Sequence, residues 1–318
     1  MSREWAASHS RLIEELSSVA AGPADTESSL AVIRAEMLRF GLAPAERAGS
    51  GRQLSKSANV EFSITGADAS QRILICASLE VEEVGGVAGL LVAAGVWAAE
   101  QPAVCVDLAF TVLQGSGPLA KPSSTVARDD VSVSFVLADP GAIGTVVVSS
   151  PSQQTVRIRF SSGAQKDLEA AINGVISESK PAGSLIDGAT AVLLVSESGS
   201  TELAEKVAQL ADVCQNEAQS HGCSVDIRLT PRFRGYEHPD DHSAVGIWSS
   251  ACSAVGLDVK NCVSASGSAA NFLEAQGVSA VCVGVGPGLS DLTAAESLPN
   301  RSKLVDLILS LPQISASA

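Results

Sequence analysis

Aromatic residues are scarce in this chain of 318 residues, and so are positive charges. Phe, Trp and Tyr make up 3% of the residues, and Tyr236 is the single tyrosine. Stacking platforms for nucleic-acid bases are therefore nearly lacking. The 21 Lys and Arg are outnumbered by 35 Asp and Glu, which gives a net charge of −14. Because a phosphate backbone needs a positive surface, we expect no nucleic-acid partner.

Long apolar runs are also missing. The longest, Gly85 to Ala99 and Ser279 to Gly286, are shorter than the roughly 20 residues of a membrane helix, so no membrane span is expected. The N-terminus lacks the basic flank, apolar core and cleavage site of a signal peptide. The seven cysteines are an odd number without a Cys-x-x-Cys pair, which favours reduced thiols. These features predict a cytoplasmic protein.

The chain has ample material for a core, since 46% of its residues are apolar. Its length suggests two domains, or one large domain with an insertion. Strand-like and helix-like segments alternate up to about Gly144, which favours an α/β sheet covered on both faces. Helical spacing predicts a helix over Arg11 to Ala20, which ends at Gly22-Pro23, and a second helix after Thr26.

The pattern changes after Gly144 and returns after Pro231. Between them we predict strands and helices that suggest a small inserted domain: strands at Thr145–Val148, Thr155–Phe160, Ala191–Ser196 and Ser224–Leu229, and helices at Lys166–Ser179 and Thr201–His221. The predicted organisation is therefore a first part of the main domain over residues 1–144, an insertion over 145–230, and a second part over 231–318.

Two glycine-rich segments do not match known nucleotide motifs. The stretch 49–57 fails the spacing of a phosphate-binding loop, and Pro287 breaks a dinucleotide-binding pattern at 284–288. The chain also has no Gly-x-Ser-x-Gly nucleophile motif.

The densest polar cluster is Glu237-His238-Pro239-Asp240-Asp241-His242. Two histidines four residues apart among three carboxylates are able to hold a divalent metal. We favour a simpler interpretation, a solvated helix start with Pro239 in the first turn and the aspartates near the positive end of the helix dipole.

The order of segments resembles the di-zinc metallopeptidase family of tripeptidase, carboxypeptidase G and acetylornithine deacetylase. The matching segments run over nearly the whole chain: Ser57–Val60, Ile73–Ala77, Gly86–Leu91, Phe110–Val112, Gly267–Phe272 and Thr293–Pro299. The resemblance implies an α/β fold, a mixed-sheet α/β/α domain like that of zinc peptidases, with an inserted α+β lid.

The family's chemistry needs two zinc ions, five protein ligands and a glutamate that activates water. The family's positions fall here on residues that mostly cannot serve: Ser78, Glu80, Glu82, Gln114, Gly115, Ala138 and Leu292. Gln114 has no titratable oxygen and Gly115 has no side chain, so the base and a ligand are lost together. The resemblance therefore implies that the zinc pair has been lost and that no catalytic residue or metal ligand remains.

The inserted lid also departs from the family's β-α-β-β-α-β pattern. Only one strand-like run lies between its two predicted helices, so the lid is expected to be reduced. The family's lid histidine and its dimer-forming edge strand are both expected to be missing. A lid-mediated homodimer is therefore not expected.

We interpret the chain as a catalytically inactive metallopeptidase-like protein, a structural or regulatory subunit that binds a protein partner or joins a larger assembly. Two alternatives stay open. The first is an active metal-dependent peptidase or amidohydrolase whose site is rebuilt from other carboxylates: Glu80, Glu82, Asp139, Asp291 and Glu296. The second is a protein that binds a peptide or amino acid without cleaving it, through Gly267, Ser268 and Asn271.

Overall fold

A computed structural model gives the fold of this chain. It describes residues 7–8, 10–12, 14–16, 26–44, 60–79, 84–111, 113–114, 121–122, 130–139, 141–239, 241–286 and 294–318. Within these residues, no helix is long and apolar enough to cross a membrane. The described residues between 7 and 16 are helical, with Leu12 and Leu16 buried, as the spacing predicts.

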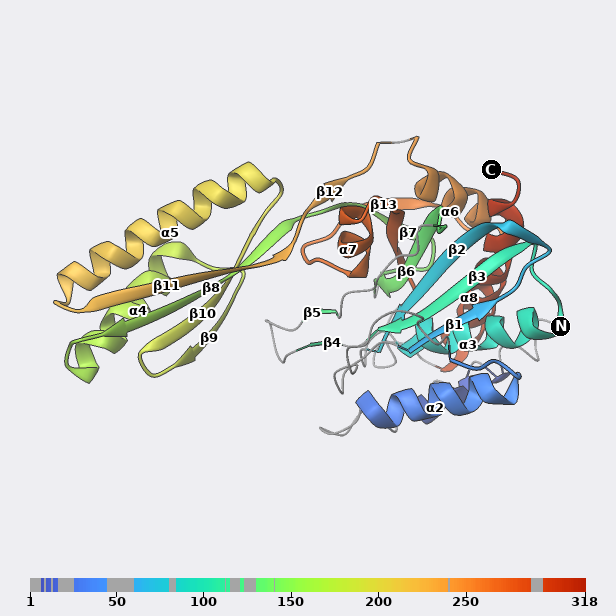
Figure 1. The fold of residues 1–318 in the computed structure, drawn as a ribbon, viewed down its shortest axis with the longest axis horizontal. Coiled ribbons are helices and arrows are strands. Elements are labelled where there is room, and N and C mark those ends of the chain that lie inside the picture. The colour runs from blue at the N-terminus through green and yellow to red at the C-terminus, as the bar shows by residue number, and fades with distance from the viewer. Residues whose placement is uncertain are drawn as a thin grey trace.

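Helices and strands are interspersed along the chain (Figure 1). The helices are α2 (Thr26–Arg39), α3 (Val84–Ala99), α4 (Gln165–Ser179), α5 (Ser200–Ser220), α6 (Ser243–Ala254), α7 (Ala269–Ala275) and α8 (Ala294–Ser315). The strands are β1 (Val60–Ile64), β2 (Asp68–Ser78), β3 (Val104–Thr111), β4 (Leu113–Gln114), β5 (Lys121–Pro122), β6 (Val133–Asp139), β7 (Thr145–Ser150), β8 (Ser152–Ser161), β9 (Gly183–Asp187), β10 (Thr190–Glu197), β11 (Ser224–Phe233), β12 (Tyr236–Glu237), β13 (Lys260–Val263) and β14 (Ser279–Gly284).

A mixed sheet of eight strands forms the main domain. Its order is β1-β3-β2-β6-β14-β7-β12, and β13 also pairs with β7. The four strands β3, β2, β6 and β14 are parallel. Strand β1 runs antiparallel to β3, and β7 runs antiparallel to β14 and β12 but parallel to β13. The C-terminal ends of the four parallel strands therefore meet at one edge of the sheet, which is where open α/β sheets bind their ligands.

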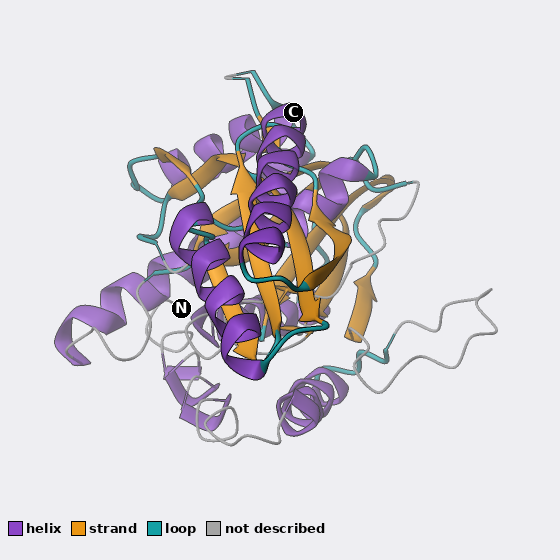
Figure 2. Ribbon diagram, turned by 90° about the vertical axis from the view of Figure 1, so that its left-hand side faces the viewer, coloured by secondary structure: helices purple, strands orange, loops and turns teal. Residues whose placement is uncertain are grey.

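The sheet is buried on both faces, as its apolar strands predict. Alternate residues of β2 belong to two different cores: Ile73 and Ile75 face one, and Leu74 and Cys76 face the other. The first core includes side chains of α2, α3, α6 and α8, and the second includes those of α7. Figure 2 shows the strands flanked by helices. The α/β fold class that the sequence predicts is confirmed.

The inserted lid has its own sheet and its own hydrophobic core. Along the chain its elements follow in the order β8-α4-β9-β10-α5-β11, and its antiparallel sheet has the strand order β11-β8-β10-β9. Buried residues of β8, β10, α4 and α5, among them Ile158, Leu193, Ile172 and Leu210, form that core. In Figure 1 the lid lies to one side of the main domain.

The expectation of a reduced lid with one strand between its helices is wrong. Two strands, β9 and β10, lie between α4 and α5, and β9 is the edge strand of the lid sheet. Every residue of β9 is half-buried or exposed, so no buried face marks it in the sequence. Pairing with β10 across a turn that contains Gly188 at a φ of +55° holds it in place.

The sheets also assign one strand differently from the sequence pattern. The strand predicted at Thr145–Val148 is β7, and it lies in the main sheet beside β14 rather than in the insertion. The last strand of the lid, β11, continues to Phe233. The chain therefore enters the lid after Ser150 and returns to the main sheet at β12.

Candidate functional site

The edge where the parallel strands end is the first candidate site, because the resemblance places the family's metal centre there. Ser78 ends β2 and lies opposite Thr111, which ends β3. Both side chains are buried, and the Thr111 hydroxyl donates a hydrogen bond to the Ala77 carbonyl at 3.3 Å. Asp139 ends β6 opposite Gly284 of β14.

The structure brings some of the predicted site residues to this edge. Ser78 and Ala138 lie there, and Gln114 lies in β4, paired with Lys121 of β5. The remaining predicted residues lie outside the described part of the chain: Glu80, Glu82, Gly115, Asp291 and Leu292. The side chains of Gln114, Asp139 and Glu296 lie outside it as well.

The described side chains at this edge do not fit a zinc pair. They are the hydroxyls of Ser78 and Thr111 and the methyl of Ala138, whereas zinc takes imidazole, thiolate or carboxylate ligands. The described histidines are elsewhere: His221 follows helix α5 of the lid, and His238 and His242 precede α6. The described side chains of this edge therefore supply no zinc ligand.

The start of α7 carries the predicted ligand-binding residues Gly267, Ser268 and Asn271. The Ser268 hydroxyl accepts from the Ala270 N–H at 3.2 Å, and the Asn271 side-chain oxygen accepts from the Ser268 N–H at 2.8 Å, which makes a capping box. A Cβ on Gly267 would lie 2.3 Å from the Phe233 ring, so glycine is required at this close approach.

The Asn271 side chain also ties three segments together. Its oxygen accepts from the Ser150 hydroxyl at 3.1 Å, and its amide donates to the Arg234 carbonyl at 2.9 Å. Ser150 ends the strand that leads into the lid, and Arg234 follows the strand that returns from it. The polar groups of Ser268 and Asn271 are thus engaged with the protein itself, and ligand binding through Gly267, Ser268 and Asn271 stays a prediction.

The second candidate site is the histidine pair at 238 and 242, which the sequence pattern places at a solvated helix start. That interpretation is wrong for His238, whose side chain is 3% exposed. Helix α6 begins at Ser243 with His242 as its N-cap, so Pro239 lies before the helix rather than in its first turn. The rings of Tyr236, His238 and His242 stack in series, with centroids 4.4 Å and 3.7 Å apart.

Glu274 of helix α7 completes this cluster. Its Oε1 lies 3.7 Å from His238 Nε2 and 3.4 Å from His242 Nε2, and it accepts from the Ala280 N–H at 2.6 Å. His238 Nε2 lies 2.9 Å from the Ala280 carbonyl, and His242 Nε2 lies 3.3 Å from the Ser279 hydroxyl. Nothing in the sequence links Glu274 to the histidines, because α7 and β14 bring it there only in the fold.

Burial controls the charge of this cluster. Desolvation, helped by the neighbouring His242, lowers the pKa of His238 to about 4. Desolvation also lowers the pKa of His242 and raises the pKa of Glu274. Near neutral pH both imidazoles are therefore uncharged, which is the form of histidine that binds metals.

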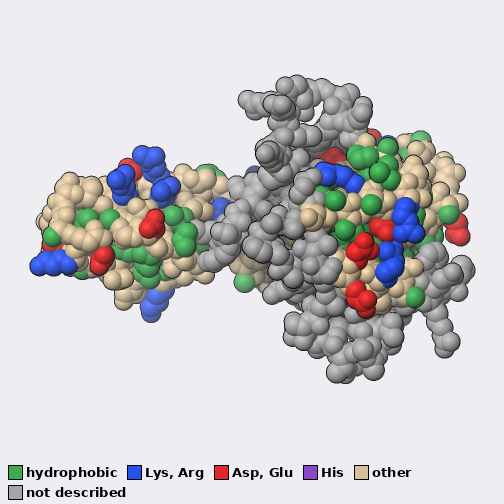
Figure 3. All heavy atoms as spheres, turned by 90° about the horizontal axis from the view of Figure 1, so that it is seen from below, with side chains coloured by type: hydrophobic (Ala, Val, Ile, Leu, Met, Phe, Trp, Pro, Cys, Tyr) green, Lys and Arg blue, Asp and Glu red, His purple; other side chains and the backbone are tan. Residues whose placement is uncertain are grey.

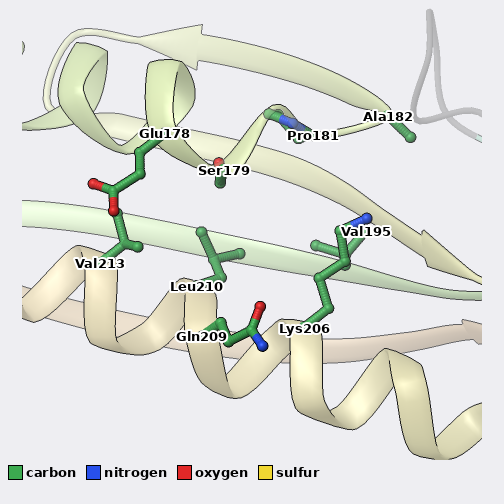
Figure 4. Close-up of a pocket in the computed structure, with 9 residues that line it drawn as sticks. All are labelled: Glu178, Ser179, Pro181, Ala182, Val195, Lys206, Gln209, Leu210 and Val213. Atoms are coloured by element: carbon green, nitrogen blue, oxygen red, sulfur yellow. The ribbon is translucent and has the colours of Figure 1, made fainter.

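A pocket of about 360 Å³ is a third feature, and it lies within the lid. Side chains of α5, including Lys206, Leu210 and Val213, line one wall, and the segment that ends α4 and enters β9 lines the other (Figure 4). The lining is mainly apolar, and Lys206 forms an ion pair with Glu197 of β10. All nine lining residues belong to the lid, so the pocket is separate from both clusters of the main domain.

Comparison with known proteins identifies the fold. No family model matches the sequence, and no curated protein matches it. Solved structures do match over nearly the whole chain. Aminopeptidase PepT from Bacillus cereus has a TM-score of 0.72 at 13% identity, with 98% of this chain and 99% of that chain covered.

Two further structures extend this comparison. YxeP from Bacillus subtilis, a dinuclear metal-binding peptidase of the M20 family, has a TM-score of 0.65 at 14% identity over 96% of this chain and 99% of its own. A hydantoinase/carbamoylase family amidase from Burkholderia vietnamiensis has a TM-score of 0.71 at 13% identity over 98% of each chain. The chain thus has the fold of M20-type peptidases and amidohydrolases, and at these identities the likeness concerns the fold alone.

Proposed function

We propose that this chain is a catalytically inactive metallopeptidase-like protein that acts as a structural or regulatory subunit. The observation that carries the proposal is the edge formed by the ends of the parallel strands. By the resemblance, Ser78 stands at the position of an imidazole ligand of the family's zinc pair and Ala138 at that of a carboxylate ligand, and a hydroxyl and a methyl group do not replace them. We further propose that the family's zinc pair has been lost and that the protein is cytoplasmic.

A hydrolysis screen tests this proposal. Purified protein is incubated with tripeptides and N-acyl amino acids in the presence of added zinc, cobalt or manganese. We expect no turnover above a metal-only blank, since Gln114 cannot serve as the general base. Hydrolysis that a chelator abolishes would contradict the proposal and support a rebuilt carboxylate site.

If hydrolysis is observed, two variants show which cluster of residues is responsible. Loss of hydrolysis in Glu82→Gln, with activity retained in Glu274→Gln, would assign it to the strand-end edge and to the rebuilt set of Glu80, Glu82, Asp139, Asp291 and Glu296.

The lid offers the surface on which a partner is proposed to dock. β9 is an edge strand, and Leu185 and Ile186 on it are 56% and 49% exposed. Figure 3 shows hydrophobic side chains on the surface of the lid. An exposed edge strand with apolar side chains pairs readily with another chain. We expected no lid-mediated homodimer because the edge strand was predicted to be missing. Since β9 is such an edge strand, that reason no longer holds.

Sedimentation velocity of an Ile186→Lys variant tests this docking surface. We expect the variant to melt at the temperature of the wild type, because Ile186 is exposed, and to lose the wild type's self-association or its co-purifying partner. Leu38→Lys is the matched control, since Leu38 on α2 is 61% exposed and lies in the main domain. An assembly that Ile186→Lys leaves intact would contradict docking at β9.

A further inference from the structure

The cluster of His238, His242 and Glu274 is distinct from the strand-end edge. It lies at the start of β14, beside Ser279 and Ala280, whereas the edge lies where β14 ends at Gly284. At about 3.3 Å per residue the two places are roughly 17 Å apart along the strand. What the cluster binds is thus independent of whether the strand-end edge is catalytic.

We propose that His238 Nε2, His242 Nε2 and Glu274 Oε1 bind one zinc ion, with the fourth position open to water. In the described part of the chain these three residues form a group whose ligand atoms all lie within 4.8 Å of one another. The carboxylate oxygen is 3.7 Å and 3.4 Å from the two nitrogens. Zinc bonds of about 2.0–2.2 Å put tetrahedral ligands roughly 3.3–3.6 Å apart, and both oxygen–nitrogen distances are close to that range.

The charge of the cluster favours a cation. Glu274 is 22% exposed, and no Lys or Arg of the described residues pairs with it. The polar groups around its Oε1 are the Ala280 N–H and the Nε2 atoms of the two imidazoles. A half-buried carboxylate without a positive partner is costly, and a divalent ion would compensate it.

The donor set selects the class of metal. Two imidazoles and one carboxylate suit zinc and its neighbours among the transition metals, whereas calcium and magnesium prefer an all-oxygen shell. The Ser279 hydroxyl, 3.3 Å from His242 Nε2 and 2.7 Å from the Ser243 hydroxyl, lies where it can hold a metal-bound water.

Binding requires one local rearrangement. The rings of His238 and His242 are stacked, with 21° between their planes, so their in-plane lone pairs run nearly parallel. One imidazole must turn about its Cβ–Cγ bond for both nitrogens to face one ion. His238 then gives up its contact with the Ala280 carbonyl and changes tautomer: by exchange with solvent its single ring proton moves from Nε2 to Nδ1, which leaves the Nε2 lone pair of the neutral imidazole for the ion.

The site has a structural consequence. It would join the segment that returns from the lid, the start of α6 and the end of α7 at one point. Bound zinc therefore stabilises the native state by mass action. It also fixes the segment that follows the lid to helices α6 and α7 of the main domain.

Zinc titration of the chelator-treated full-length protein tests the proposal. We expect one equivalent to bind by calorimetry and to raise the melting temperature. His242→Ala and Glu274→Gln should each weaken binding by about 100-fold and remove the thermal shift. His221→Ala is the matched control, because His221 Nε2 lies 3.4 Å from Glu217 Oε2 in a pair that belongs to no three-ligand group of the described residues.

A second measurement needs no variant. Histidine ring NMR of the wild type should show two of the four imidazoles responding together at one equivalent of zinc. A cobalt spectrum without sulfur-to-metal charge transfer should exclude the cysteines as ligands. Zinc affinity that is equal in wild type, His242→Ala and Glu274→Gln, or an NMR response of all four or of no histidines, would overturn the proposal.

Discussion

Arg72 and Asp107 show how single residues carry charge inside the sheet. Arg72 Nη1 lies 2.8 Å from Asp107 Oδ1, and Arg72 Nε lies 2.8 Å from Asp130 Oδ2. The Asp107 side chain is 7% exposed, whereas that of Asp130 is 57% exposed. Because water screens the outer pair, the two carboxylates contribute unequally to stability.

Asp107→Ala is expected to lower the free energy of unfolding by about 2–4 kcal/mol, since it leaves the Arg72 guanidinium without its buried partner. Asp130→Ala, the matched control, should cost about 0–1 kcal/mol. Urea denaturation of both variants measures the difference. Equal losses of unfolding free energy in the two variants would show that burial does not determine how much the Arg72–Asp107 ion pair contributes to stability.

The buried cysteines provide a prediction about pH. Burial raises the pKa of Cys214 to about 12 and that of Cys252 to about 11. At pH 8 only on the order of one Cys214 thiol in ten thousand is a thiolate, the reactive form, and the fraction rises with pH. Iodoacetamide should therefore leave both residues unmodified in the native protein and modify them in urea.

Mass spectrometry of the alkylated peptides reads this out. Cys223, which is half-buried, serves as the internal comparison and should react faster. Labelling of native Cys214 at the rate of Cys223 would mean that the lid core is open to solvent.

Elements with buried apolar residues were predictable from the sequence, and elements without them were not. The buried strands β2, β3 and β14 of the main sheet show apolar runs, and helices α4 and α5 show apolar spacing, because burial itself produces these patterns. β9 has no buried residue, and only its partner β10 makes it a strand. The pattern of hydrophobic residues therefore does not predict this strand.

Glycine positions test the packing of elements. A Cβ on Gly66, in the turn between β1 and β2, would lie 2.1 Å from the Val104 carbonyl carbon, so the backbone must move. Gly66→Ala should cost about 2–4 kcal/mol. Gly246 is exposed in α6 with nothing within 4 Å of its added Cβ, so Gly246→Ala should stabilise by about 0.5–1 kcal/mol.

Thermal melts of the two alanine variants test both predictions: the melting temperature should fall in Gly66→Ala and rise in Gly246→Ala. A neutral Gly66→Ala variant would contradict the close approach of this turn to β3.

The whole molecule combines a peptidase-type fold with long-range contacts that the sequence could not reveal. The resemblance predicted the fold and the location of the strand-end edge. It could not predict that Asn271 links the two connections to the lid, or that Glu274 meets His238 and His242, since each contact joins segments far apart in sequence. Local patterns report local structure, whereas these contacts depend on the packing of α7 against the sheet.

Metal content tests the central claim most directly, namely that the family's zinc pair is lost. Protein loaded with zinc and dialysed is analysed by elemental mass spectrometry, beside the double variant His242→Ala, Glu274→Gln. Our account predicts no more than one equivalent in the wild type and none in the variant. Two equivalents in the wild type, or zinc retained by the variant together with chelator-sensitive hydrolysis, would contradict it.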